Sequence, residues 1–125
     1  MNIEFLGKTS SSGISELMCK TSFFIHTSYI ENSPNSVCEA QILGVPVIAT
    51  NVGGISSLIT NNVTGILVPA NDPFYLAPQI IELYNNKDKS KRLGEKGRLE
   101  AQLRHDKTTI INDLISIYKK IKTSN

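Results

Sequence analysis

The chain has 125 residues, about the size of one domain. Hydrophobic residues make up 40% and charged residues 19%, which excludes a disordered tail, and no apolar run is long enough to span a membrane. Cys19 and Cys38 lack the spacing of a metal or disulfide framework, and no apolar signal segment follows Met1. We therefore expect a cytoplasmic protein.

The net charge of +2 is unevenly distributed. Residues 1–86 carry net −4, whereas residues 87–122 carry net +6. A basic end can attract nucleic acid or an anionic membrane surface. Acidic residues are interspersed throughout it, which favours a solvated helical surface. We expect no nucleic-acid partner and keep peripheral membrane contact as an alternative.

The first third of the chain predicts two strands and two helices. Residues 3–7 form a short apolar run, typical of a strand. Residues 12–20 predict a helix with Leu17 and Met18 facing inward, and residues 23–26 predict a strand that is buried on both faces. The next helix is expected over residues 34–43, and two cap residues define its start and end. Ser33 is a good N-cap before Pro34, and Gly44 is typical of a helix end.

The remaining elements continue this alternation. Residues 46–50 and 65–68 predict strands around a short helix at 55–59. Asn71, Asp72 and Pro73 begin a helix that runs to Asn85, with a kink or a later start at Pro78. Its inward face is expected to carry four side chains: Leu76, Ile80, Ile81 and Tyr84.

Two further helices are expected, a polar one over 87–104 and an amphipathic one over 106–122. The apolar side of the second carries five residues: Ile110, Leu114, Ile117, Tyr118 and Ile121. Apolar strands that alternate with helices predict an α/β fold, with a parallel sheet of about four strands and helices on both faces.

Several short motifs carry little weight. Gly7-Lys8-Thr9 matches the end of a phosphate-binding loop, but Asn2 stands where its first glycine is required. The sequon at Asn62 is read as chance. His26 and His105 have no partners at metal-ligand spacing, so core packing is expected for His26 and a surface position for His105.

The segment from Glu31 to Glu39 carries the most specific chemistry. One carboxylate lies in the loop after a buried parallel strand, and the other lies eight positions on, along the next helix. Ligands of open α/β sheets bind at this sheet edge. A helix start favours phosphate, and carboxylates accept hydrogen bonds from sugar hydroxyls. The local chemistry fits a nucleotide sugar, and it fits two solvated glutamates equally well.

Together with its neighbours, this segment resembles the retaining GT-B glycosyltransferases of family four, also called glycosyl transferases group 1. Glu31 and Glu39 have the spacing of that family's E-x7-E motif. Other matches follow in the family's order: Phe5-Leu6-Gly7, Glu39-Ala40, residues 44–50, Val52-Gly53-Gly54, residues 64–69, Asn71-Asp72-Pro73 and residues 114–118. The resemblance covers residues 3–122.

The resemblance implies a partial Rossmann-like sheet, as in the C-terminal donor-binding domain of GT-B enzymes, and a role for each matching residue. Glu31 is the catalytic position and contacts hydroxyls of the transferred sugar, and Glu39 binds the ribose. Gly53 and Gly54 form a tight loop beside the site. The donor sugar and diphosphate are bound by the loop and helix start: Asn32, Ser33, Asn35, Ser36 and Val37.

The implied reaction transfers a hexosyl group from a UDP-, GDP- or ADP-sugar with retention, without a cofactor or an active-site metal. Polysaccharide biosynthesis is the implied role, by analogy. Three departures matter: Pro34 and Asn35 replace glycines, Ser57 replaces a frequent glutamate, and the family's chains are about three times longer. Residues 1–125 are therefore expected to be one truncated donor domain, without the acceptor-binding domain and the basic residues that hold the diphosphate, and to be inactive alone.

The truncation also bears on association. In the family's strand order 3-2-1-4-5-6, the four expected strands are the third to the sixth. Residues 3–7 would then pair with residues 23–27 or with an edge of another copy, giving a homo-oligomer. Two other functions stay open: a GT-B relative such as a nucleotide-sugar epimerase, and a non-catalytic remnant or interaction module.

Overall fold

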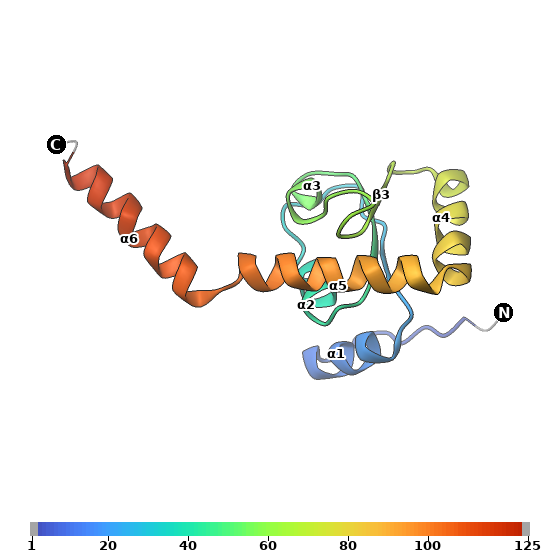
Figure 1. The fold of residues 1–125 in the computed structure, drawn as a ribbon. Helices are drawn as coiled ribbons and strands as arrows, with labels where there is room; N and C mark the ends of the chain where they lie inside the picture. Colours follow the sequence, from blue (N-terminus) through green and yellow to red (C-terminus); the bar gives the residue numbers. More distant parts are fainter. Residues whose placement is uncertain (1–2, 124–125) are drawn as a thin grey trace.

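The computed structural model describes residues 3–123, and in this part of the chain it has an α/β fold (Figure 1). Three parallel strands form one sheet in the order β1 (Phe24–His26), β2 (Val47–Thr50) and β3 (Ile66–Val68). The α/β class and the parallel sheet agree with the prediction. The strand number is three in the described residues, not four.

The predicted strand over residues 3–7 is absent. Phe5 is 94% exposed, and Ile3 and Leu6 are exposed as well. No described strand extends alongside this segment, so its backbone groups have no ladder partner and apolar character alone does not make a strand. The proposed pairing with residues 23–27 is therefore wrong, whereas pairing with another copy stays a prediction.

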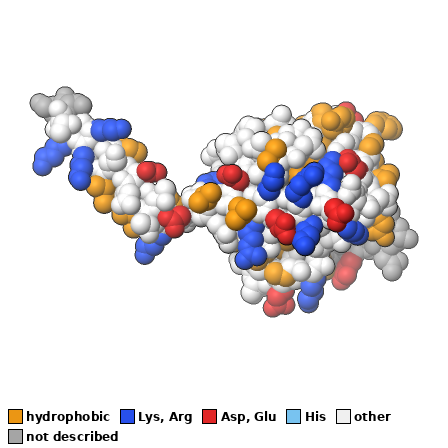
Figure 2. All heavy atoms as spheres, in the orientation of Figure 1, with side chains coloured by type: hydrophobic (Ala, Val, Ile, Leu, Met, Phe, Trp, Pro, Cys, Tyr) orange, Lys and Arg blue, Asp and Glu red, His pale blue; other side chains and the backbone are white. Residues whose placement is uncertain are grey.

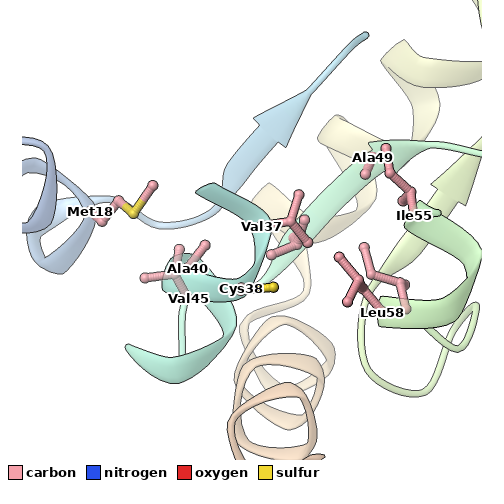
Figure 3. Packing of buried hydrophobic residues seen from close by; sticks show 10 residues of the cluster. Met18, Val37, Cys38, Ala40, Val45, Ala49, Ile55 and Leu58 are labelled. Atoms are coloured by element: carbon pink, nitrogen blue, oxygen red, sulfur yellow. The ribbon is translucent and has the colours of Figure 1, made fainter. Parts of the chain in front are cut away.

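Side chains of the strands alternate between two apolar layers. Val47 and Ala49 pack with residues of the helices α2 (Asn35–Ile42) and α3 (Ile55–Leu58). Figure 3 shows Ala49 beside Ile55 of α3. Ile48, between them, packs on the opposite side with Leu83 and Leu93. Met18 of α1 (Ser11–Lys20) joins the first layer, while Leu17 stays 37% exposed. Only one of the two side chains expected inward on α1 is thus buried.

The two ends of α2 show how cap residues set its length. Pro34 occupies the N-cap position and no side chain caps the helix, so Ser33 is not the N-cap. The helix ends as expected, because Gly44 adopts a φ of 76°. Gly44 N then bonds Gln41 O and Val45 N bonds Ala40 O, both at 2.9 Å. This Schellman arrangement turns the chain directly into β2.

Helix α4 (Pro73–Asn85) begins at Pro73 and passes through Pro78 without a break. A later start at Pro78 is therefore wrong. The Asp72 side chain accepts from Tyr75 N at 2.8 Å and fixes the start. The inward face differs from the prediction: Leu83 is fully buried and Leu76 and Ile80 partly so, whereas Ile81 and Tyr84 are 60% and 64% exposed.

Helix α5 (Lys87–Arg104) crosses α2 closely although it is strongly polar. A narrow buried stripe makes this possible: Ser90, Leu93, Gly94, Gly97 and Ala101. A Cβ at Gly94 would overlap the Gly44 carbonyl. At the end of α5, the Arg104 guanidinium donates to Gln41 Oε1 and Leu58 O, each at 3.3 Å.

Helix α6 (Lys107–Thr123) extends away from the body (Figure 1). No side chain of α6 is buried, and its apolar side is open to solvent, with Tyr118 70% exposed. Along residues 3–123, no helix combines the length and apolar character that crossing a bilayer requires. Figure 2 shows basic and acidic side chains interspersed on the face that carries α5.

Candidate functional site

The candidate site lies where the parallel strands end. The loop after β1 contains Glu31, and the loop after β2 contains Gly53 and Gly54. Because all three strands run in the same direction, these loops emerge at one edge of the sheet.

The Glu31 carboxylate belongs to a cluster of three side chains. Its Oε1 accepts from Ser28 Oγ at 2.8 Å and lies 3.0 Å from His26 Nε2. Ser28 Oγ and His26 Nε2 are themselves 3.0 Å apart. The hydrogen bond from Ser28, and next that from His26 with its charge, hold the pKa of the Glu31 carboxyl below its ordinary value against the opposing effect of burial. The site thus keeps this carboxylate ionised.

His26 corrects the expectation of core packing. Its ring is only partly buried and lies beside the Phe24 ring, with centroids 6.1 Å apart. Its Nε2 faces the Glu31 carboxylate. The signal in the sequence was the spacing: His26 and Ser28 are two residues apart at a strand end, where alternate residues point to the same side. His105 is exposed at the end of α5, as expected.

The Gly53-Gly54 loop packs against the backbone of the Glu31 loop. A Cβ on Gly53 would overlap the Glu31 carbonyl, and a Cβ on Gly54 would overlap the Asn32 carbonyl. Gly53 also has a φ of 50°. Gly54 N donates to Glu31 O at 3.4 Å. The structure therefore brings Gly53 and Gly54 together with Glu31 and Asn32, and the absence of side chains makes this contact possible.

The other expected donor-binding residues lie at the start of α2. Asn32, Ser33 and Asn35 are exposed and Ser36 is half-buried. Val37 is fully buried, and its amide donates to Pro34 O at 3.2 Å. The first-turn amides of Asn35 and Ser36 have no acceptor within a helix.

Glu39 lies on the exposed side of α2, one turn beyond Asn35. The side of α2 that faces the core carries Val37, Cys38, Ala40 and Gln41. The helix therefore offers its start and one carboxylate to solvent, near the loop that carries the other carboxylate.

A hollow of about 300 Å³ at the same sheet edge was not anticipated from the sequence. Thr27, Thr50 and Val68, which stand at the ends of the three strands, line it together with Tyr29 and the start of α4. Tyr29 OH donates to Asn71 Oδ1 at 3.0 Å. Two threonines, Thr27 directly after β1 and Thr50 at the end of β2, were the available signal.

These features can be compared with known proteins. The family model described as "Glycosyl transferases group 1" matches residues 1–100. The chain belongs to the glycosyl transferases group 1 family. Its three parallel strands and flanking helices are those of solved glycosyltransferases; one from Rickettsia africae is 28% identical, with a TM-score of 0.77 over 92% of this chain and 31% of that chain.

Two curated relatives show the sequence similarity of this chain to known glycosyltransferases. The chain is 36% identical over 97 residues to the uncharacterized glycosyltransferase MJ1178 of Methanocaldococcus jannaschii, and 33% identical over 95 residues to the capsular polysaccharide biosynthesis glycosyltransferase CapM of Staphylococcus aureus. These matches cover 78% and 76% of this chain, but only 28% and 25% of the relatives.

The structure of Anabaena Alr3699/HepE in complex with UDP-glucose is 26% identical, with a TM-score of 0.77, and the match covers 86% of this chain and 30% of that chain. The chain therefore spans less than a third of the length of these relatives and solved structures. Its candidate site is the part that the Glu31 and Gly53-Gly54 loops build.

Proposed function

We propose that this chain is the donor-binding part of a retaining family-four glycosyltransferase, which transfers a hexosyl group from a nucleoside diphosphate sugar. One observation carries the proposal: in a group 1 chain, an ionised Glu31 is fixed by Ser28 and His26 at the carboxyl edge of a parallel sheet. Such a carboxylate accepts hydrogen bonds from sugar hydroxyls and repels phosphate.

In this proposal, the two glutamates and the start of α2 contact different parts of the donor. Glu31 contacts the transferred sugar, and the exposed Glu39 accepts from the ribose hydroxyls. The diphosphate lies toward the start of α2, where unbonded amides and the helix dipole favour negative charge. The complex of Anabaena Alr3699/HepE with UDP-glucose supports UDP as the first nucleotide to test. The reaction is proposed to proceed without a metal.

The proposal assigns residues 1–125 to one donor domain and acceptor binding to further sequence upstream. The short coverage of the relatives supports this division. Activity of the chain alone is not expected, because an acceptor site and basic diphosphate ligands are needed as well. The similarity to CapM supports polysaccharide synthesis as the process. A cytoplasmic location stays a prediction.

An NMR titration of the 15N-labelled chain tests this function. UDP-glucose, GDP-mannose and ADP-glucose are added separately to wild type, to Glu39→Ala and to the control Glu100→Ala on the exposed side of α5. We expect millimolar binding of one nucleotide class, about −4 kcal/mol. The shifts should cluster at residues 31–39 and 53–54, persist in the control and disappear in Glu39→Ala.

A well-dispersed spectrum that none of the three nucleotide sugars changes contradicts the proposal. Shifts located only on α5 or α6 contradict it equally, because these helices lie outside the candidate site.

A further inference from the structure

The hydrogen bonds of the Glu31 cluster converge on one oxygen. Ser28 Oγ donates to Oε1 at 2.8 Å, and His26 Nε2 lies 3.0 Å from the same atom. Within residues 3–123, Oε2 accepts no hydrogen bond. The Glu31 side chain is 25% exposed to solvent. One oxygen is thus occupied by the protein and the other is available to a ligand.

The donor in the contact between His26 and Glu31 follows from the chemistry. An ionised carboxylate only accepts, so Nε2 of His26 carries the hydrogen. The single hydrogen of Ser28 also goes to Oε1. Both the neutral Nε2–H tautomer and the imidazolium can donate in this way. The contact therefore does not require a charged histidine.

Each member of the cluster is also held through its backbone. His26 pairs with Ala49 in the sheet. Ser28 O accepts from Thr50 Oγ1 at 2.6 Å, and Glu31 O accepts from Gly54 N at 3.4 Å. Because β2 and its following loop fix all three members, the direction of the carboxylate is set before a ligand arrives.

We propose that His26 is a positioning residue, which together with Ser28 occupies Oε1 of Glu31 and leaves Oε2 to accept a hydroxyl of the donor sugar. This role rests on the proposed function. It assigns the ligand contact to an uncharged O–H group, because Oε2 of an ionised carboxylate repels phosphate oxygens and accepts from hydroxyls. It also predicts that His26 affects sugar binding without touching the sugar.

The test uses the full chain with 13C-labelled glutamate. The variants are His26→Leu, which removes the donor, and His26→Gln, which keeps an N–H donor. Ser28→Ala and Glu31→Gln test the other two members of the cluster, and His105→Leu, at the C-cap of α5, is the control. The 13Cδ shift of Glu31 is followed against pH, and UDP-glucose binding is measured by titration at neutral pH.

We expect the pKa of the Glu31 carboxyl to rise in the single variants His26→Leu and Ser28→Ala. The rise should be larger in Ser28→Ala than in His26→Leu, because the hydrogen bond from Ser28 is the main cause of the lowered pKa. UDP-glucose binding should weaken about tenfold in His26→Leu. His26→Gln should restore most of it, and His105→Leu should match wild type. UDP alone, which has no sugar, should bind His26→Leu and wild type equally.

Three results overturn the proposal. An unchanged Glu31 titration in His26→Leu shows that the contact does not form. Unchanged UDP-glucose binding in His26→Leu, with weakened binding in Glu31→Gln, shows that Glu31 acts without His26 and leaves the proposed function intact. If wild type binds no nucleotide sugar, the proposed function and this role fail together, although the Glu31 titration still reports whether the cluster exists.

Discussion

The contact between the two loops of the site can be tested at two adjacent glycines. Gly54→Ala places a methyl group on the Asn32 carbonyl while the backbone angle stays favourable, since its φ is −77°. Gly53→Ala adds a second cost, because its φ is 50° and its Cβ would overlap the Glu31 carbonyl. Gly44→Ala is the control: its φ is 76°, but its Cβ would meet only Arg98 side-chain atoms, the nearest 3.5 Å away.

The three alanine variants separate the cost of backbone strain from the cost of steric overlap. A left-handed φ costs a residue with a Cβ about 1–2 kcal/mol, which is the whole effect expected for Gly44→Ala. Forcing a methyl group into packed backbone costs about 1–3 kcal/mol, which is the effect expected for Gly54→Ala. Gly53→Ala combines both, about 2–5 kcal/mol. Such a loss is a large part of the stability of a small domain.

Urea denaturation followed by circular dichroism measures the free energy of unfolding, and 1H–15N spectra locate the change. Gly54→Ala should shift the amides of residues 31–33 and weaken UDP-glucose binding, whereas Gly44→Ala should lower stability and leave these amides unchanged. The reasoning is refuted if Gly54→Ala is as stable as wild type and residues 31–33 keep their shifts. In that case the two loops do not touch.

Three further predictions concern the scaffold. Leu93→Ala should lower stability by about 2–5 kcal/mol, whereas Leu99→Ala, at a 62% exposed position on the same helix, should change it by less than about 0.5 kcal/mol in urea denaturation. Gln41→Leu removes a buried amide that joins α2 to α3 and α5, and should cost about 1–3 kcal/mol in the same assay. Hydrogen bonds from the Thr109 backbone and hydroxyl lower the pKa of Asp106. This cap therefore stabilises α6 above the ordinary aspartate pKa and is lost as pH falls through the folded value, so the protection factors of the α6 amides in hydrogen exchange should fall below about pH 4.

Local signals predicted most element positions because they act within a few residues. Gly44 ends α2 through its positive φ, and Asp72 caps the start of α4 through a side-chain hydrogen bond. Both helix limits could therefore be predicted from the sequence. Pro34 shows the limit of such rules. A serine followed by proline indicated a cap at Ser33, yet the proline itself takes the N-cap position.

Long-range packing decided what the sequence did not reveal. Residues 3–7 are apolar enough for a strand, but a strand also needs a neighbour. On α4, the sequence pattern placed Tyr84 on the inward face, whereas contact with the sheet buries Leu83 and leaves Tyr84 exposed. On α5, glycines within a polar helix gave no apolar signal, although Gly94 and Gly97 let it approach α2.

The candidate site, like the fold, could be predicted from the sequence only in part. Glu31, Glu39 and the glycine pair were named from order and spacing. The residues that hold Glu31 were identified from the structure, because the two-residue spacing of His26 and Ser28 becomes informative only once the end of β1 is known. His26 contacts Glu31 because it is the last residue of β1, next to the loop that carries the carboxylate.

The register of the sheet links the fold to this site. His26 pairs with Ala49, and both lie on the side of the sheet that faces α2. Side chains alternate along a strand, so a slip of one residue between β1 and β2 would turn His26 to the opposite face and separate it from Glu31. The same slip would turn Phe24 out of the apolar layer formed with α2 and α3 and turn Ile25 into it, at a cost in apolar contact. The apolar pattern that stabilises the core therefore also fixes the histidine beside the carboxylate.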